Sequence, residues 1–160
     1  MEQKEIHITY SQFGSVEEMN AEDRELVSAS IEAMGGAYAP YSHFNVGAAV
    51  LLEDGTIVTG SNQENAAYPS GLCAERTALF HAGSQYPDKA ITTLAIAASN
   101  SEGFTELPVT PCGACRQVLL EAEMRCKRPI RVLMYGTAFV YEILGTKDLL
   151  PLSFTDKSMD

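Results

Sequence analysis

The chain reads FNVGAAVLLEDGTIVTG from Phe44 to Gly60, and this stretch decides the fold. Apolar residues dominate positions 44–52 and favour a strand, while Asp54-Gly55 is a dipeptide typical of tight hairpin turns. Residues 56–60 then return as the partner strand. The sequence therefore predicts an antiparallel hairpin over residues 44–60.

Further elements are predicted on both sides of this hairpin. Apolar residues recur at helical spacing from Leu26 to Met34 and are followed by Gly35-Gly36, which predicts a helix over residues 21–34. Further helices are expected at residues 73–83 and 112–124. Further strands are expected at residues 90–98, 130–135 and 139–144.

The connection between the last two strands fixes their relative direction. Only Gly136-Thr137-Ala138 separates them, whereas a parallel pair needs a crossover of about a dozen residues or more. These two strands must therefore be antiparallel. Taken in order, the elements predict an α/β fold, a three-layer α-β-α sandwich around a mixed five-stranded sheet.

Length and composition are those of a single globular domain. The 160 residues suffice to bury a core without disulfides, and contents of 46% hydrophobic and 20% charged residues are ordinary. We expect one domain over residues 1–160. Residues 1–15 are expected to form an N-terminal arm, in which the alternation at 4–10 permits a short strand, and residues 156–160 are expected to fray.

The charge balance argues against two classes of partner. Eleven Lys and Arg against 21 Asp and Glu give a net charge of −10 without a basic patch, so no nucleic-acid partner is expected. No apolar run approaches the roughly twenty residues of a membrane span, and the start of the chain is too polar for a signal peptide. We therefore expect no membrane partner, a cytoplasmic location and a small, weakly charged substrate.

Two short motifs carry the chemistry, Cys73-Ala74-Glu75 and Pro111-Cys112-Gly113-Ala114-Cys115. Both lie at predicted helix N-termini, where the helix dipole favours thiolate over thiol. Cys73, Cys112 and Cys115 offer three sulfur ligands for one tetrahedral Zn²⁺ per chain and leave its fourth position to water. The motifs therefore predict a hydrolytic zinc site.

Two residues next to the candidate zinc ligands, Glu75 and Arg76, are expected to contribute to the chemistry of the site. Taken alone, Glu75 is explained by the preference for acidic residues in a first helical turn. Its spacing from Cys73 nevertheless lets the carboxylate approach the open side of the ion without binding it, so Glu75 is the candidate proton carrier. Arg76 is a candidate donor to a ligand sulfur, where its charge would offset the thiolates.

Two other uses of the cysteines compete with this interpretation. A redox pair of Cys112 and Cys115 would leave Cys73 and Glu75 without a role. A closed structural zinc site would need Cys126 as its fourth ligand. If the helix persists, Cys126 lies about 16 Å beyond Cys115 along the axis, at about 1.5 Å per residue, so both sulfurs cannot bind one ion.

With these residues in place, the chain resembles the cytidine deaminase family, in its small-subunit form that acts on free nucleosides. The resemblance runs from about residue 21 to residue 154, through blocks that occur in family order. These blocks are Tyr41–Ala49, Asn62–Pro69, Cys73–Leu79, Pro111–Val118 and Leu149–Phe154. The arm before about residue 15 is longer than is usual in the family, and the loop at residues 136–138 is shorter.

The resemblance implies an activity and a set of roles. The activity is zinc-dependent hydrolytic deamination of cytidine and deoxycytidine to uridine and deoxyuridine, with release of ammonia, in pyrimidine salvage. Glu75 would carry protons, Asn62 and Glu64 would bind the ribose hydroxyls, and Phe44 would pack against the pyrimidine. The family further implies a homotetramer with shared active sites, in which Phe154 enters the site of a neighbouring subunit.

Two alternative functions remain open from the sequence. A deaminase of another aminopyrimidine, such as blasticidin S, would keep the zinc ligands but would not need the ribose-binding pair Asn62 and Glu64. A non-catalytic interaction module stabilised by zinc would close the metal site with four protein ligands.

Overall fold

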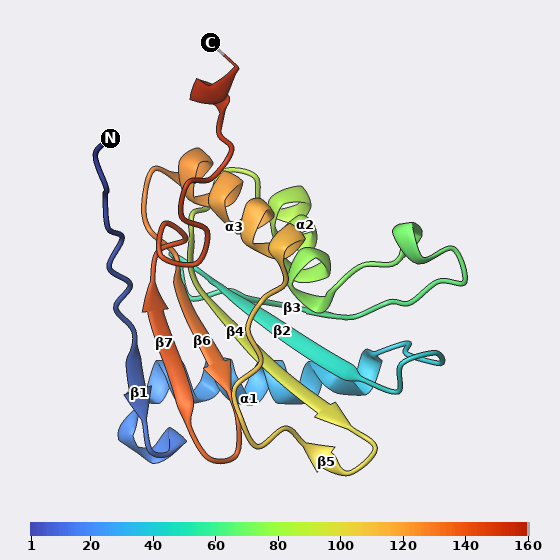
Figure 1. Cartoon of the computed structure of the whole chain (residues 1–160). Coiled ribbons are helices and arrows are strands. Elements are labelled where there is room, and N and C mark those ends of the chain that lie inside the picture. The colour runs from blue at the N-terminus through green and yellow to red at the C-terminus, as the bar shows by residue number, and fades with distance from the viewer. Residues whose placement is uncertain (160) are drawn as a thin grey trace.

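The computed structural model describes residues 1–159 and arranges them in three layers (Figure 1). Helix α1, Ala21–Ala33, covers one face of a central sheet. Helices α2, Ala74–Gln85, and α3, Gly113–Cys126, lie side by side on the other face. The three predicted helices and the α-β-α layering are confirmed.

The sheet has seven strands, so the predicted count of five is wrong. Five of the seven match the predicted strands, namely β2 Asn45–Leu52, β3 Ile57–Ser61, β4 Ile91–Asn100, β6 Arg131–Tyr135 and β7 Val140–Leu144. The two additional strands are short, β1 Ser11–Phe13 and β5 Gly103–Phe104. β1 pairs with the edge strand β7, and β5 folds back on the end of β4. Both segments use backbone groups that a sheet edge would otherwise leave unpaired.

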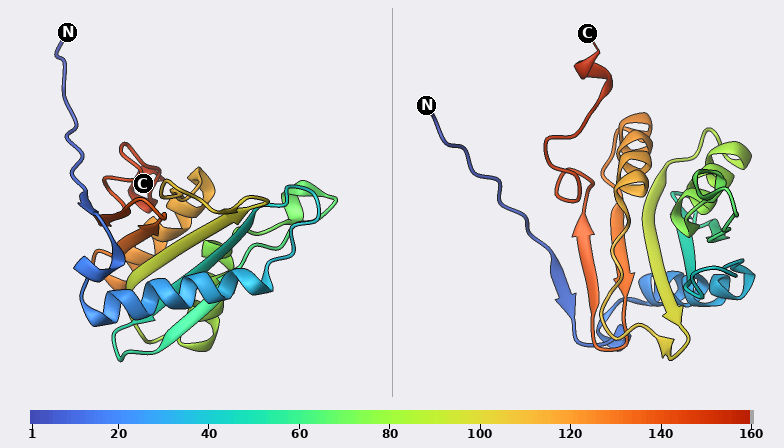
Figure 2. Two further views of the ribbon diagram at one scale, coloured as in Figure 1. Left: turned by 90° about the horizontal axis from the view of Figure 1, so that it is seen from below. Right: turned by 45° about the vertical axis from the view of Figure 1, so that its right-hand side comes forward.

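The two ends of the chain differ from expectation in detail. Residues 1–10 hold no strand, and the strand of the N-terminal arm begins only at Ser11. Ahead of it the arm extends away from the sandwich (Figure 2). Within the tail expected to fray, Asp156–Ser158 forms a 3₁₀ turn, and residue 160 lies outside the described residues.

The strands follow the order β1-β7-β6-β4-β2-β3, with β5 beside β4. β4 and β6 are parallel, and helix α3 lies in the crossover that joins them. All other neighbours are antiparallel, including the predicted pair β6 and β7. The sheet is therefore mixed. β3 and β4 are both antiparallel to β2 and run in the same direction, so the segments that lead from them to α2 and α3 begin at the same edge of the sheet.

The hairpin predicted at residues 44–60 is present as β2 and β3. Gly55 adopts φ +86° in the turn, a conformation that glycine adopts without strain, and Leu52 and Thr56 are joined by a backbone hydrogen bond of 2.9 Å. Side chains of β2 alternate between the two faces. Ala48, Val50 and Leu52 join the core under α2 and α3, while Ala49 and Leu51 join the core over α1. The hairpin thus links both apolar cores.

Two glycines let the helices approach the hairpin closely. A Cβ atom on Gly47 would lie 2.0 Å from the carbonyl oxygen of Ser30 in α1. A Cβ atom on Gly60 would lie 2.4 Å from the backbone nitrogen of Ala78 in α2. Such distances are impossible for a real side chain, so β3 and α2 can pack at this spacing only with glycine at position 60.

A buried ion pair anchors the start of α1 to the sheet. Asp23 is 2% exposed, and its two carboxylate oxygens accept hydrogen bonds of 3.0 and 2.7 Å from Nη1 and Nη2 of Arg131 on β6. The Nε of Arg131 donates to Glu142 on β7 at 2.7 Å. These two carboxylates, Asp23 most strongly, raise the pKa of the Arg131 guanidinium. The guanidinium group of Arg131 thus connects α1, β6 and β7.

Replacing Arg131 by methionine is expected to lower the free energy of unfolding by about 3 kcal/mol, because it leaves the charge of Asp23 buried without its cationic partner and with only the Asn20 side-chain amide donating to it. Urea denaturation of the variant and of the wild type at equal protein concentration measures the difference. Glu142→Gln is the control, since it leaves Asp23 paired and should cost less than about 1 kcal/mol. Equal stability of Arg131→Met and the wild type would show that the pair contributes little.

Candidate metal centre

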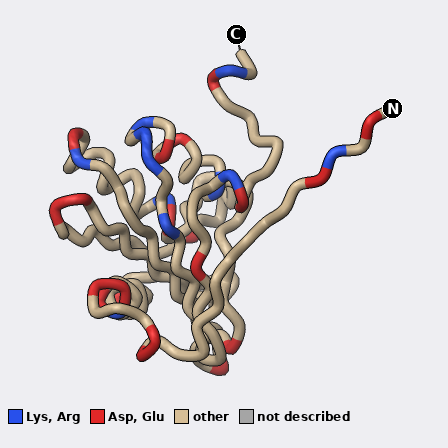
Figure 3. Tube along the Cα trace, turned by 90° about the vertical axis from the view of Figure 1, so that its left-hand side faces the viewer, with Lys and Arg blue, Asp and Glu red and all other residues tan. Residues whose placement is uncertain are grey.

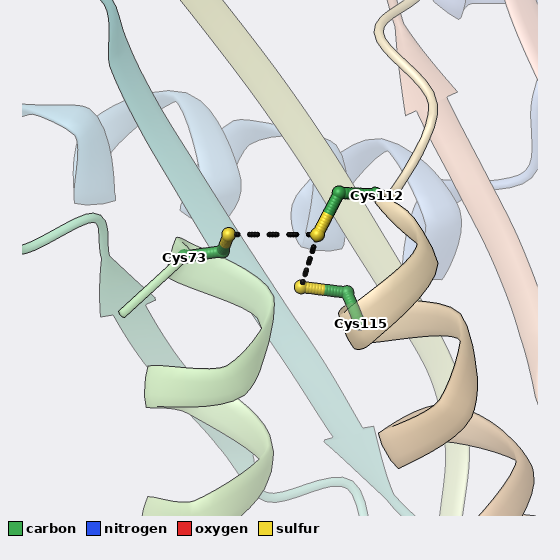
Figure 4. Close-up of side chains that lie close together, drawn as sticks. All are labelled: Cys73, Cys112 and Cys115. Atoms are coloured by element: carbon green, nitrogen blue, oxygen red, sulfur yellow. Dashed lines mark hydrogen bonds between the residues drawn. The ribbon is translucent and has the colours of Figure 1, made fainter. Parts of the chain in front are cut away.

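Three cysteine side chains meet where α2 and α3 begin (Figure 4). Cys73 and Cys112 are the residues that immediately precede α2 and α3, and Cys115 lies in the first turn of α3. The Sγ of Cys112 lies 3.7 Å from that of Cys73 and 3.6 Å from that of Cys115, and all three sulfurs lie within 4.8 Å of one another. Residues 39 positions apart in sequence thus form one cluster.

The spacing of the sulfurs fits a zinc ion. With Zn–S bonds of about 2.3 Å and tetrahedral angles, ligand sulfurs lie about 3.8 Å apart. The observed separations of 3.7 and 3.6 Å agree with this value. Three thiolates complete three corners of the tetrahedron, and the chain places no fourth cysteine nearby, since Cys126 lies outside the cluster. The donor set is that of a zinc site with one open position.

The surroundings favour ionised sulfur at Cys73. A hydrogen bond from the Cys115 thiol lowers the pKa of Cys73 to about 5, and Arg76 contributes to the same shift. The pKa of Cys115 is raised, first because its thiol donates to Cys73 and then because it is buried. The N-terminal end of α2 adds a positive dipole beside Cys73. One thiolate therefore forms readily, and binding of a cation would displace the remaining thiol protons.

Glu75 lies in the first turn of α2 and is only 5% exposed. Removal from water raises the pKa of its carboxyl group above the ordinary value, and the nearby charge of Cys73 acts in the same direction. The side chain lines the same cavity as Cys73 and Cys112. A buried carboxyl group with a raised pKa, next to a metal site, is suited to hold a proton and release it.

Arg76 faces the ligand sulfur, as the sequence suggested for a donor. Its Nη2 lies 3.7 Å from the Sγ of Cys73, and the interaction raises the pKa of the guanidinium. Within the described residues its buried Nε has no hydrogen-bond partner. The guanidinium group thus lies beside the sulfur of Cys73.

A cavity of about 590 Å³ opens beside the cysteine cluster. Its lining includes three of the four candidate substrate residues, Phe44, Asn62 and Glu64, together with Glu75 and Arg76. Phe44 immediately precedes β2, and Asn62 and Glu64 lie in the segment that follows β3. Residues from both sides of the hairpin are thus brought next to the candidate zinc ligands.

The side chains of Asn62 and Glu64 form hydrogen bonds with backbone groups of the protein. The amide of Asn62 accepts a hydrogen bond of 2.8 Å from Val46 N–H and donates one of 2.8 Å to the carbonyl of Phe44. The carboxylate of Glu64 accepts bonds from the loop at Tyr41 and Ser42. These bonds fix the orientation of both side chains in the free protein.

Phe154 does not line the cavity of its own chain. The ring is 60% exposed, and the backbone carbonyl accepts a hydrogen bond of 2.9 Å from Gln117 on α3. Cys126 is likewise remote from the cluster. It lines a different cavity of about 550 Å³, between the ends of α2 and α3 that lie away from the cysteines.

Some residues at the site escaped the sequence analysis. Ser42 and Thr110 line the cavity, and Arg116 holds the loop before α3 by donating from Nε to the carbonyl of Pro111 at 2.8 Å and from Nη1 to that of Leu149 at 2.6 Å. Ser42 and Arg116 lie inside the sequence blocks that carry the family resemblance, but their roles depend on contacts between distant segments. Spacing along the chain carries no signal for such contacts.

The charge distribution is acidic overall. Short stretches of acidic and basic residues are scattered along the trace in Figure 3, consistent with the surplus of Asp and Glu in the sequence. Among the described residues, no helix has the length and apolar character that a membrane crossing requires.

A three-layer α/β domain that gathers three thiols and a buried carboxyl group at two helix N-termini belongs to the class of zinc-dependent hydrolytic enzymes. Residues 20–128 match the sequence model of the cytidine and deoxycytidylate deaminase zinc-binding region. The chain belongs to this family of zinc-dependent deaminases.

Individual relatives and solved structures support the same assignment. A cytidine deaminase from Halalkalibacterium halodurans is 41% identical over 139 residues, which cover 86% of this chain and 98% of the relative. The crystal structure of cytidine deaminase from Burkholderia pseudomallei is similar with a TM-score of 0.71 and 38% identity, covering 81% of this chain and 97% of that chain. For cytidine deaminase from Mycobacterium tuberculosis the TM-score is 0.66 at 33% identity, with coverage of 85% and 99%. The family resemblance seen in the sequence is therefore confirmed.

Proposed function

We propose that this protein hydrolyses the exocyclic amine of cytidine and deoxycytidine, producing uridine or deoxyuridine and ammonia. One observation carries the proposal: a buried carboxyl group, Glu75, and two of the three clustered cysteines, Cys73 and Cys112, line one cavity with side chains suited to a base and a sugar. Bound zinc supplies Lewis acidity and lowers the pKa of water to about 7.

The residues of the chain divide the remaining work. Cys73, Cys112 and Cys115 hold the ion, and Arg76 offsets their negative charge. Glu75 takes a proton from the attacking water as oxygen bonds to C4 of the base, and delivers that proton to ring N3. It then carries the second proton of the water oxygen to the amine, the C4–N bond breaks, and ammonia leaves. Atoms balance as nucleoside plus water giving uridine plus ammonia.

Substrate binding falls to residues at the two ends of the hairpin. Phe44 provides an apolar wall for the flat pyrimidine, and Asn62 and Glu64 offer donor and acceptor groups to sugar hydroxyls. Their position in the cavity favours a nucleoside over blasticidin S. A zinc-stabilised interaction module without catalysis would not need a buried carboxyl group beside an open metal position.

The test is incubation of zinc-loaded protein with cytidine, following loss of the cytosine absorbance and formation of uridine and ammonia. Blasticidin S and buffer alone are the parallel incubations. Uridine formation with little turnover of blasticidin S is the expected result. Turnover of blasticidin S alone, or of neither compound, would refute the proposal.

We further propose a cytoplasmic homotetramer with shared active sites. Phe154 is exposed and does not line the cavity of its own chain, which suits insertion into the site of a neighbouring subunit. Thiol ligands persist in the reducing cytoplasm. Light scattering at working concentration is expected to give four times the mass of 17.3 kDa for one chain, and a monomer would contradict the role of Phe154.

A further inference from the structure

Two residues of the loop before β2, Tyr41 and Ser42, together donate three hydrogen bonds to the carboxylate of Glu64. Oε2 accepts hydrogen bonds of 2.9 Å from Tyr41 N–H and 3.3 Å from Ser42 N–H. The hydroxyl of Ser42 donates to Oε1 of the same carboxylate. These bonds lower the pKa of Glu64, the Ser42 hydroxyl contributing most, so the carboxylate stays ionised at neutral pH.

Ser42 also touches the other side of the cavity. Its Oγ accepts a hydrogen bond of 3.1 Å from the N–H of Phe44, whose carbonyl is held by Asn62. Between them, His43 adopts φ +54°, a left-handed conformation that costs a non-glycine residue about 1–2 kcal/mol. Ser42 is thus the side chain that joins Glu64 to the segment carrying Phe44.

The carboxylate of Glu64 has a limited number of hydrogen-bond acceptor positions, and only some of them remain for a ligand. A carboxylate oxygen accepts about two hydrogen bonds, so the two backbone donors fill Oε2. Oε1 has one acceptor position used by Ser42, and among residues 1–159 no donor occupies the second. Without the Ser42 hydroxyl, the carboxylate could rotate or bind water through Oε1, and the free position would no longer be directed to one place.

We propose that Ser42 is a positioning residue for substrate recognition, which orients Oε1 of Glu64 toward a single sugar hydroxyl. The proposal rests on the proposed function, because it takes a nucleoside sugar as the ligand of Glu64. Ser42 itself need not touch the substrate. Its contribution therefore belongs to binding and not to the chemical step.

Replacing Ser42 by alanine is expected to raise KM for cytidine about 10-fold, the cost of weakening one hydrogen bond to a charged group, while kcat changes less than about 2-fold. Calorimetric titration with uridine should show the same increase in Kd. Ser42→Thr retains the hydroxyl and should restore both values to near those of the wild type. An unchanged KM in Ser42→Ala, or a threonine variant as impaired as the alanine variant, would overturn the proposal.

A substrate without the 2′- and 3′-hydroxyls distinguishes an effect through Glu64 from an effect through the rest of the loop. With 2′,3′-dideoxycytidine, Ser42→Ala and the wild type should have KM values within about 2-fold, because the ligand no longer offers a hydroxyl to Glu64. A 10-fold difference that persists would place the effect of Ser42 on Phe44 and contradict the proposal. Ser84→Ala, at an exposed serine of α2, is the matched control and should behave as wild type.

Different results would refute the proposed deaminase activity and the proposed role of Ser42. Wild-type protein that binds zinc but does not deaminate cytidine would overturn the proposed function, and this inference with it. Wild-type protein that deaminates cytidine, with Ser42→Ala equal to it in KM and in Kd for uridine, would overturn only the role of Ser42.

Discussion

Glu75→Gln is expected to lower turnover of cytidine by about 10³-fold while zinc remains near one ion per chain, since proton transfer by a placed side chain contributes about 10²–10⁴-fold. Glutamine has nearly the same shape but cannot accept and release a proton. The native carboxyl group is buried, and its pKa is raised by removal from water, which suits a group that must hold a proton between two transfers. Steady-state kinetics and zinc analysis of the same preparation measure both quantities.

The matched control for this variant is Glu22→Gln. Glu22 is also a glutamate in the first turn of a helix, α1, but it is exposed and lies on the opposite side of the sheet. Its replacement should leave turnover and zinc content unchanged. A Glu75→Gln enzyme with wild-type turnover would remove Glu75 as the proton carrier, and loss of zinc in that variant would instead point to a role in metal binding.

Cys112→Ala is expected to release zinc and abolish turnover together. The Sγ of Cys112 lies 3.7 Å from that of Cys73 and 3.6 Å from that of Cys115. Its loss leaves only two candidate sulfur ligands, Cys73 and Cys115. Two sulfurs and water do not provide the donor set of a stable zinc site. Metal analysis after dialysis should fall from about one zinc per chain to near zero, and circular dichroism checks that the fold is retained.

Cys126→Ala serves as the control for Cys112→Ala. Cys126 is the last residue of α3 and lies outside the cysteine cluster, so its variant should retain zinc and activity. Full zinc occupancy in Cys112→Ala would contradict its assignment as a ligand. Loss of zinc in Cys126→Ala would revive the closed four-cysteine site that helix geometry argues against.

Local patterns predict most of the fold and the candidate metal ligands. The hairpin at 44–60, the three helices and the antiparallel final pair follow from periodicity and from turn residues. Strand β1 is not predicted, because its pairing depends on the free edge of β7, far along the chain. Three residues hold too little pattern to indicate a strand, and only the completed sheet supplies their partner.

The same limit applies to the site. The cysteine motifs carry their chemistry in their spacing, so the sequence alone singles them out. Ser42 carries no such signal, because its bond to Glu64 joins residues 22 positions apart. Whether a serine positions a carboxylate is decided by the path of the backbone between them, which composition and periodicity do not encode.

The ion pair between Asp23 and Arg131 has a consequence for biosynthesis. These residues are 108 positions apart, so helix α1 leaves the ribosome long before the cation that neutralises its first turn. A nascent chain that ends before β6 can bury that turn only by burying an unpaired carboxylate, which is costly. We therefore expect α1 to dock stably on the sheet only after synthesis has passed Arg131.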